Sequence, residues 1–279
     1  MGQPEQRAEG AGPFTTRLAW RLPEGGTAVW ESRLARRRGV IAVHRPGEPD
    51  GRHAVADPVS ISRLRRLNTV AAVAFVVGGV LFAAGAGTAQ FGSGDPTESA
   101  WIYFAGGLCF NTGGYVSLLQ VVNAPRHDVG TGTLVTRRWR WWSFEPMRLD
   151  WLSVVVLFAG TLVFAVDLLD SFLQGLDAQQ VNRLIWAPDI VGCVLFLVSG
   201  HLAFLELCHG RRCVHLRSLA WWIVAVNQLG SVLFMVSAIA AFTRPGTGSL
   251  VNTGVANWGT LVGALCFSLG GVLQLFERP

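Results

Sequence analysis

The sequence predicts an all-α integral membrane protein, in which six transmembrane helices form three parallel two-helix hairpin repeats beside a small cytoplasmic N-terminal β-hairpin element. Three observations predict this fold class: long apolar segments, a one-sided distribution of arginine, and a glycine–phenylalanine pattern that recurs three times. Of the 279 residues, 51% are hydrophobic and only 15% are charged. A typical soluble domain carries about 25% charged residues, so this composition is short of what a water-facing surface needs.

Six segments after residue 66 are long enough to cross a bilayer, which takes about 20 helical residues. They are Thr69–Phe91, Ala100–Asn123, Trp151–Leu173, Leu184–Leu207, Ser218–Phe242 and Thr253–Phe276. A soluble core of six such helices would leave too little polar surface. The chain therefore divides into a cytoplasmic N-terminal region (1–66), hairpins at 67–123, 151–208 and 209–277, and a basic cytoplasmic loop at 124–150.

Arginine sets the orientation. All 23 basic side chains are arginine, which excludes Schiff-base, P-loop and general-base lysines. Only Arg183 and Arg244 fall on one side of the predicted spans, and the rest fall on the other. Positive charge is retained in the cytoplasm, so we expect a multi-pass protein of the bacterial inner membrane with both termini cytoplasmic. The expected partner of the arginine clusters is the anionic headgroup layer of the bilayer. No nucleic-acid partner is predicted, and a homo-oligomer is left open.

One pattern recurs in the helices. The first helix of each hairpin carries Gly-x3-Phe, as Gly78–Phe82, Gly160–Phe164 and Gly230–Phe234. The second carries Gly-x3-Phe-x3-Gly, as Gly106–Phe110–Gly114, Gly192–Phe196–Gly200 and Gly263–Phe267–Gly271. Ten positions after each of the second helices' phenylalanines stands Gln120, Glu206 or Glu277. Small residues four apart let helix backbones approach closely. The pattern predicts three related hairpins around an axis along the membrane normal, unless glycine and phenylalanine recur only because membrane helices are rich in them.

These residues resemble the YrhK-like family of small bacterial membrane proteins. The matching stretches run from Asn257-Trp258-Gly259 to Glu277 in the last hairpin and from Asn182 to Glu206 in the middle one. The last hairpin, residues 252–277, matches best, and in the first hairpin Gln120 replaces the terminal acid. The resemblance implies membrane hairpins and no particular activity.

The N-terminal region contains one strand signal. Apolar residues alternate over Thr15–Arg33 around a glycine-containing turn, which predicts a β-hairpin. Residues 1–13 and 45–60 are rich in glycine, proline and charge and are predicted to be flexible. The cluster of Arg33, Arg36, Arg37 and Arg38 has two interpretations, a topology determinant that touches lipid and a site for a specific partner.

Charged groups inside a bilayer are costly and are often functional. Asp167 and Asp189 lie at matched depth on consecutive predicted helices, about 8–9 Å below the outer surface at 1.5 Å per helical residue. The equivalent positions in the other hairpins are not acidic. The two carboxylates could share a proton or bind a cation. The alternative is that each pairs locally, for example with Arg183.

Two further groups of polar residues lie toward the cytoplasm. His201 and Glu206 are about 140° apart around one helix, so a hydrogen-bonded packing histidine is favoured over a ligand. Cys208, His209, Cys213 and His215 could be soft metal ligands, but their spacing matches no standard zinc motif. No metal, cofactor or catalytic residue is predicted.

The packing motifs outnumber the chemical ones. The sequence therefore predicts a non-enzymatic membrane protein with a scaffolding or sensing role. The alternative is a small transporter or a proton or cation pathway through Asp167 and Asp189.

Overall fold

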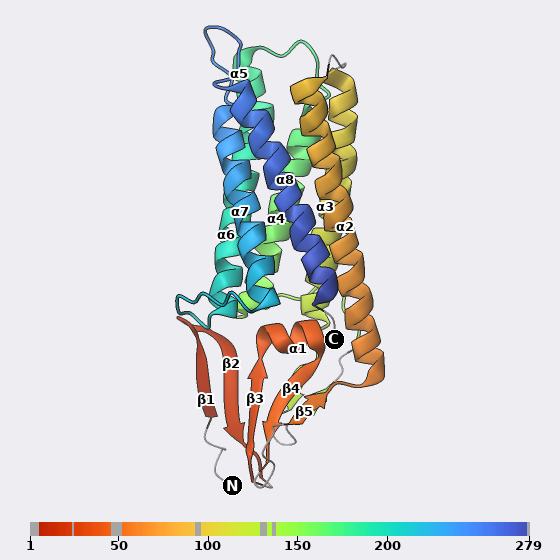
Figure 1. The fold of residues 1–279 in the computed structure, drawn as a ribbon, viewed down its shortest axis with the longest axis vertical. Helices are drawn as coiled ribbons and strands as arrows, with labels where there is room; N and C mark the ends of the chain where they lie inside the picture. Colours follow the sequence, from red (N-terminus) through yellow and green to blue (C-terminus); the bar gives the residue numbers. More distant parts are fainter. Residues whose placement is uncertain are drawn as a thin grey trace.

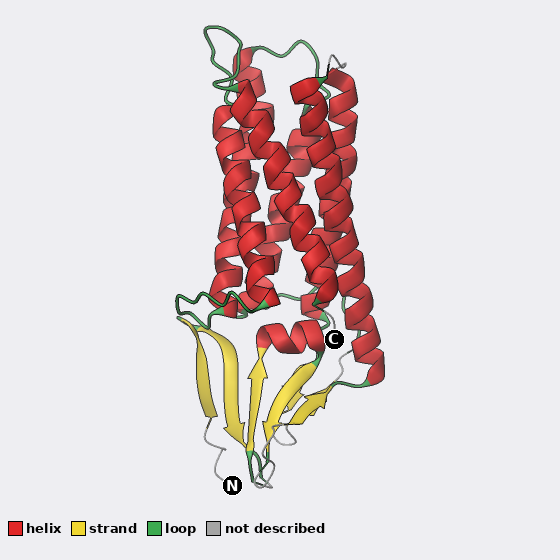
Figure 2. Cartoon of the chain, viewed as in Figure 1, coloured by secondary structure: helices red, strands yellow, loops and turns green. Residues whose placement is uncertain are grey.

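The computed structural model of the chain describes residues 6–23, 25–45, 52–92, 96–128, 133–135 and 138–277. It consists of a bundle of long helices with a small antiparallel sheet at one end (Figure 1). The helix axes are nearly aligned, and consecutive helices run in opposite directions. We call the end of the bundle next to the sheet the inner end, and the opposite end the outer end. Figure 2 shows that the strands of this sheet all lie beyond the inner end of the bundle.

The bundle is a closed ring of helices. Its members are α2 (Pro58–Phe91), α3 (Pro96–Val122), α4 (Leu149–Asp170), α6 (Ala187–Leu207), α7 (Leu219–Ala240) and α8 (Thr253–Phe276). The short α5 (Ala178–Val181) and the π-helical turn η1 (Asn182–Trp186) lead directly into α6. Each long helix packs on its neighbours in chain order, and α8 packs on α2 to close the ring.

Five helical segments in the described part of the chain are long and apolar enough to cross a membrane: α2, α4, the continuous α5–η1–α6 segment, α7 and α8. The sixth helix of the ring, α3, is 27 residues long but is not among the five. Asn111, Thr112, Tyr115 and Gln120 add polar groups to the middle and inner end of α3. Every helix of the ring exposes apolar side chains on its outer surface, for example Val73, Leu108 and Val166.

Helix α2 begins eleven positions earlier than the predicted span. Asp57 caps it by accepting hydrogen bonds from the backbone amides of Val59 and Ser60, and Pro58 occupies the first turn. Both features are typical of helix N-termini. The 34 residues of α2 correspond to a length of about 50 Å, against about 30 Å for a bilayer core. Its first turns therefore run alongside the sheet (Figure 1).

The sheet is larger than the predicted hairpin. Its order is β1 (Gln6–Ala11), β2 (Phe14–Arg21), β3 (Thr27–Glu31), β4 (Val40–His44) and β5 (Arg52–Val55). The predicted hairpin is the β2–β3 pair, in which Trp20 lies opposite Ala28. The predicted flexibility of 1–13 and 45–60 was wrong for the described residues there, which form β1, β5 and the start of α2. These polar strands pair with β2 and β4, and their composition alone did not indicate those partners.

A short helix and a second hairpin connect the sheet to the bundle. Helix α1 (Ser32–Arg38) lies between the sheet and the inner end of the bundle (Figure 2). It ends at Gly39, whose φ of 64° is in the left-handed region and whose amide donates to the Ala35 carbonyl. The strands β6 (Arg126–Asp128) and β7 (Thr133–Val135), between α3 and α4, place Leu134 in the core of the sheet beside Trp20.

The glycine–phenylalanine pattern is a set of reciprocal contacts. In each of the pairs α2–α3, α4–α6 and α7–α8, the first glycine of one helix faces the phenylalanine of the other. The six contacts are Gly78–Phe110, Gly106–Phe82, Gly160–Phe196, Gly192–Phe164, Gly230–Phe267 and Gly263–Phe234. The second glycines of α3, α6 and α8 face the next pair instead: Gly114 meets Phe158, Gly200 meets Gln228, and Gly271 meets Val76.

This geometry predicts that Gly192→Leu destabilises the bundle. A Cβ atom at Gly192 would lie 2.5 Å from the Phe164 ring, and overpacking of this kind costs about 1–3 kcal/mol. We expect a lower thermal unfolding temperature in detergent. The control is Gly246→Ala, because a Cβ atom there meets nothing within 4 Å. Equal stability of the Gly192 variant and the wild type would show that this contact does not hold α4 to α6.

Candidate functional site

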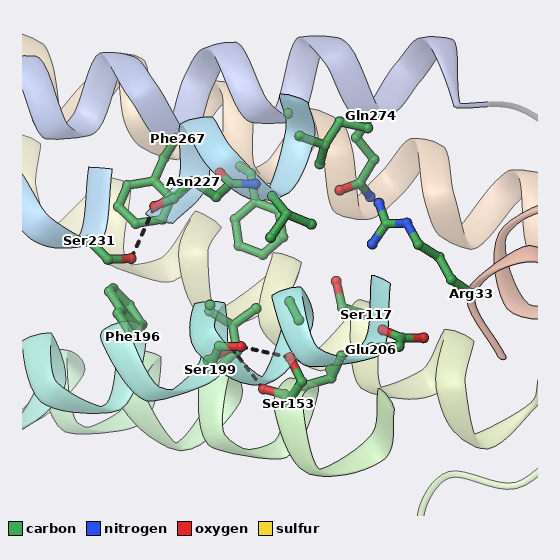
Figure 3. Close-up of a pocket in the computed structure, with 18 of the residues that line it drawn as sticks. Arg33, Ser117, Ser153, Phe196, Ser199, Glu206, Asn227, Ser231, Phe267 and Gln274 are labelled. Carbon is green, nitrogen blue, oxygen red and sulfur yellow. Dashed lines mark hydrogen bonds between the residues drawn. The ribbon is translucent and has the colours of Figure 1, made fainter. Parts of the chain in front are cut away.

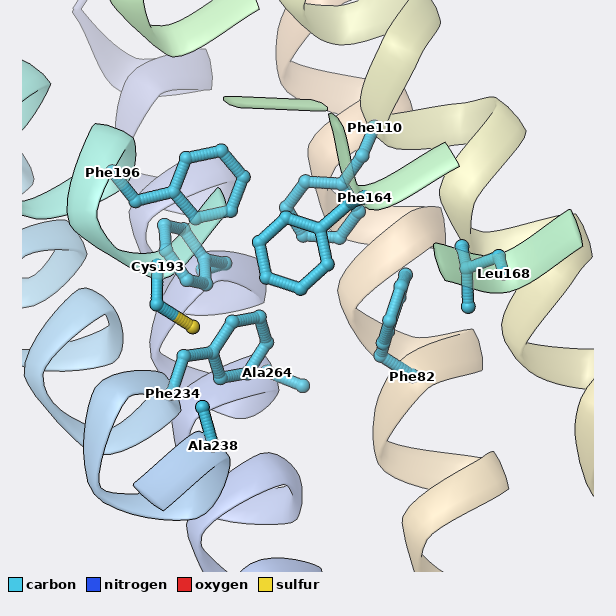
Figure 4. Close-up of a cluster of buried hydrophobic side chains, with 10 residues drawn as sticks. Phe82, Phe110, Phe164, Leu168, Cys193, Phe196, Phe234, Ala238 and Ala264 are labelled. Atoms are coloured by element: carbon cyan, nitrogen blue, oxygen red, sulfur yellow. The ribbon is translucent and has the colours of Figure 1, made fainter. Parts of the chain in front are cut away.

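An aromatic layer crosses the bundle at mid-height. Each helix of the ring contributes one buried phenylalanine: Phe82, Phe110, Phe164, Phe196, Phe234 and Phe267. Their neighbouring ring centroids are 5.1–6.3 Å apart, and Figure 4 shows the rings converging from different helices. The phenylalanines of α2, α4 and α7 line a cavity on the outer side, and those of α3, α6 and α8 line a cavity on the inner side.

The outer cavity brings the two predicted aspartates together. It has a volume of about 340 Å³, and both Asp167 of α4 and Asp189 of α6 line it. The two carboxylates are close enough to interact electrostatically. The Cys193 thiol donates weakly to Asp189, with 3.8 Å between Sγ and Oδ1. Among the described residues, the Asp167 carboxylate has no hydrogen-bond or ion-pair partner. The cavity therefore holds acceptor groups that a proton or a cation could satisfy.

The π-helical turn η1 fixes the start of α6. The Asn182 side chain donates to the carbonyl of Thr243 and accepts from its amide, at 2.6 and 2.9 Å. The Trp186 indole donates to the Ala238 carbonyl at 2.8 Å. Turns with i→i+5 hydrogen bonds often occur at functional sites. Here the turn ties α6 to the outer end of α7, three residues before Asp189.

Three predicted members of the site lie outside the outer cavity: Arg183, His201 and Glu206. Arg183 is exposed on η1, does not line the outer cavity, and forms no ion pair with either aspartate in the described structure. Local pairing with Arg183 therefore does not explain the two carboxylates. His201 is exposed on the outer surface of α6, so the predicted packing histidine was wrong. Glu206 on the same helix is only 2% exposed.

The inner cavity has a volume of about 110 Å³. Figure 3 shows Phe196 and Phe267 near one end of it and Arg33 and Glu206 near the other. Hydroxyl and amide groups also line the cavity: Ser117, Ser153, Ser199, Asn227 and Ser231. Ser153 and Ser199 each donate to the backbone carbonyl of the other, at 3.0 and 2.9 Å, and so join α4 to α6. The volume is enough for several water molecules.

Three arginines of α1 close the inner end of the bundle. Arg36 donates to both carboxylate oxygens of Glu206, at 3.2 and 2.9 Å, and its Nε lies 3.9 Å from Asp150. Arg33 makes a bidentate contact with Glu277, at 3.1 and 3.0 Å, and Arg37 lies 3.8 Å from the same carboxylate. We call these six residues the inner ion network: Arg33, Arg36, Arg37, Asp150, Glu206 and Glu277.

Burial and charge act in opposite directions in this network. Burial by itself would raise the pKa of the Glu277 carboxyl, but the Arg33 and Arg37 guanidinium groups hold it below the ordinary value of 4.5. Burial and the neighbouring Arg36 charge lower the pKa of Arg37 to about 9. Both groups therefore stay charged at neutral pH. Burial of these ions is tolerated because each faces an opposite charge.

Further polar groups extend the network. Arg148 contacts Asp150 and Glu145, each at 2.6 Å. Arg37 also donates to Asn68 of α2, which is hydrogen-bonded to Gln274 of α8. The α2–α3 pair differs, because the position equivalent to Glu206 and Glu277 is Gln120. Gln120 is fully buried, and neither of its amide atoms has a hydrogen-bond partner among the described residues.

The predicted role of the arginine cluster as a lipid contact was wrong for two of its members. Arg36 is 3% exposed and Arg37 is 8% exposed, so both are inside the protein. The sequence did show the cluster of arginines, and it showed Glu206 and Glu277 ten positions after the phenylalanines of the helix pattern. What the sequence did not indicate is that 32–38 forms a helix beneath the bundle.

Cys208 and Cys213, in the α6–α7 loop at the inner end, form a disulfide with a Cα–Cα distance of 5.6 Å. The bond removes two of the four thiol and imidazole groups that could have held a metal. The His209 imidazole and the Thr16 hydroxyl of β2 form a hydrogen bond, with 2.9 Å between Nδ1 and Oγ1. The loop therefore docks on the sheet.

No protein-family model, curated protein or solved structure matches the chain. The resemblance to the YrhK-like family stays a prediction.

The first prediction at this site concerns the pair Arg36–Glu206. Arg36→Gln leaves Glu206 buried without the guanidinium that donates to both of its oxygens, and such changes cost about 3–5 kcal/mol. We expect a large loss in the free energy of unfolding in detergent. The control Arg17→Gln removes two partly exposed ion pairs, with Glu9 and Glu31, and exposed pairs are worth about 0–1 kcal/mol each. Similar losses in the two variants would contradict the assignment.

The second prediction at this site is how the stability of the protein depends on pH. The folded-state pKa of Glu277 is lowered, so its contribution is present above the unfolded value of 4.5 and is lost as pH falls through the lower folded value. We expect unfolding temperatures to fall in acid below pH 4.5, and to fall less steeply in Glu277→Gln. Identical pH profiles for the two proteins would show that Glu277 is not stabilised by Arg33 and Arg37.

Proposed function

We propose that the chain is a six-span, non-enzymatic membrane protein built from three parallel hairpin repeats, with the sheet and both termini on the cytoplasmic side of a bacterial inner membrane. The continuous ring of α2, α3, α4, α6, α7 and α8 supports a sixth span at α3, because α3 packs between two of the five apolar spans. The threefold recurrence of the glycine–phenylalanine contacts supports the repeat. The excess of arginine at the inner end supports the orientation.

Its role in this proposal is sensing. One observation supports this role: α4 and α6 each carry one acidic residue at the outer cavity and one in the inner ion network. Asp167 and Asp150 lie on α4, and Asp189 and Glu206 lie on α6. Each pair is separated by seventeen positions, or about 26 Å along a helix. Arg36 contacts the inner member of both pairs.

In this proposal, a change of charge at the outer aspartates is transmitted to the inner ion network. When both outer aspartates are charged they repel each other across the cavity, and a shared proton or a bound cation removes that repulsion. The change alters how closely α4 and α6 approach at their outer ends. Because Ser153 and Ser199 join the two helices below the aromatic layer, their inner ends move together. The movement reaches α1 through Arg36 and so reaches the sheet.

The aromatic layer favours sensing over conduction. Between the outer and inner cavities, the space bounded by Phe82, Phe110, Phe164, Phe196 and Phe234 is only about 10 Å³, too small for a hydrated ion. A proton or cation pathway is the second candidate, since the two cavities lie on opposite sides of the same layer. That function would require the phenylalanines to separate.

The test uses purified full-length protein in proteoliposomes. The protein is oriented so that the N-terminal sheet is on the outside of the vesicle, where an added protease can reach it. We expect acid or a cation inside the vesicle, where Asp167 and Asp189 then face, to change the rate at which the N-terminal sheet is cleaved. The variant Asp167→Asn/Asp189→Asn should lose this response. The matched control is Glu98→Gln, an exposed acid at the same end of the bundle, which should keep it.

If the change in cleavage rate persists in the double aspartate variant, Asp167 and Asp189 are not the sensing site. Ion flux measured in the same vesicles separates the second candidate. Flux that depends on Asp167 and Asp189 favours a pathway, and its absence together with a protease response favours a sensor.

Cysteine chemistry tests the orientation. The structure joins Cys208 and Cys213 in a disulfide, whereas the proposed cytoplasmic location of this end would keep the pair reduced. The proposed orientation therefore predicts that both thiols react with a maleimide polymer when cells are lysed rapidly. The variant Cys208→Ser/Cys213→Ser controls for labelling of the three membrane cysteines. Labelling of the pair only after treatment with a reductant would place this end on the oxidising side and reverse the proposed topology.

A further inference from the structure

One face of α2 carries basic and apolar side chains in a single stripe. The stripe consists of Arg63, Arg66, Val70, Val73, Val77 and Val80. Their spacing alternates between three and four, so they share one side of the helix. The four valines are 44–52% exposed, which places them on the outer surface of the bundle. The two arginines are at the inner end of this surface.

The basic end of the stripe borders a hollow of about 530 Å³. Its lining is Pro58, Val59, Ser62, Arg63, Arg66, Leu67 and Trp139. The Arg63 guanidinium lies 5.5 Å from the centre of the Trp139 ring, a cation–π distance. No acidic side chain lines the hollow, and neither arginine forms an ion pair in the described part of the chain. The hollow therefore presents positive charge that nothing in the described structure neutralises.

We infer that this hollow binds the phosphate headgroup of an anionic phospholipid, with an acyl chain of the same lipid along the valines of α2. Guanidinium groups bind phosphate oxygens in bidentate geometry. A tryptophan beside them is typical of the headgroup level, and basic pockets at the cytoplasmic ends of helices recognise anionic lipids. The inference rests on the membrane insertion in the proposed function, and not on the sensing role.

The dimensions fit one leaflet. From Arg66 to Val77 the helix rises about 16 Å at 1.5 Å per residue. One leaflet contributes half of a hydrocarbon core of about 30 Å. An acyl chain that starts at the arginines would thus contact Val70, Val73 and Val77 before it reached the midplane, and Val80 lies beyond it.

The experiment titrates phosphatidylglycerol into delipidated full-length protein and measures bound lipid by native mass spectrometry. We expect Arg63→Gln/Arg66→Gln to bind about 30-fold more weakly, from the contribution of two arginines at a membrane surface. Arg211→Gln/Arg212→Gln is the matched control, since these exposed arginines are also at the inner end, and it should bind as the wild type does. Phosphatidylcholine should bind weakly to all three proteins.

Equal phosphatidylglycerol binding by the Arg63/Arg66 variant and the wild type would overturn the inference. Full competition by inorganic phosphate would also overturn it, because the site would then take a free anion and have no need of the acyl chain.

The two proposals fail separately. Release of the chain from membranes by alkaline carbonate would refute the membrane function itself. A chain that resists extraction but loses no lipid binding in the Arg63/Arg66 variant refutes the lipid site alone.

Discussion

The burial of arginines from α1 at the inner end of the helix bundle is the interaction on which the rest of the structure depends. A guanidinium group taken out of water is tolerated only where carboxylates meet it with good geometry. Arg36 therefore requires Glu206 and Asp150 at fixed positions, and Arg33 requires Glu277. Those acids stand at the ends of three helices, so the same contacts fix the spacing of the bundle and the position of the sheet.

The middle pair of helices, α4 and α6, differs from the other two pairs in its acidic groups. Reciprocal glycine–phenylalanine contacts recur in all three pairs, and they produce the aromatic layer that separates the two cavities. Acidic groups at both ends occur only on α4 and α6. The outer aspartates, Asp167 and Asp189, have no acidic counterparts in the other pairs, and at the inner end the first pair carries Gln120 where the others carry glutamate. The sensing role that we propose depends on this difference between the pairs.

Periodic features were predictable from the sequence, and long-range partners were not. The apolar spans and the β2–β3 hairpin follow from local patterns, and matched depth on consecutive helices placed Asp167 beside Asp189. Strands β1 and β5 are polar and were missed, because their stability comes from neighbours in the sheet. The buried state of Arg36 was missed for a similar reason: its partner Glu206 is 170 residues away in sequence, and no local pattern joins them.

The central claim is that the outer aspartates and the inner ion network are energetically coupled through α4 and α6. A double-mutant cycle with Asp189→Asn and Arg36→Gln measures this directly, from free energies of unfolding of the four proteins in detergent at a pH where Asp189 is charged in the wild type. Sites this far apart with no coupling add to within about 0.3–0.5 kcal/mol. The account predicts a coupling energy larger than this. Additivity within that range would show that the two ends of the bundle are independent.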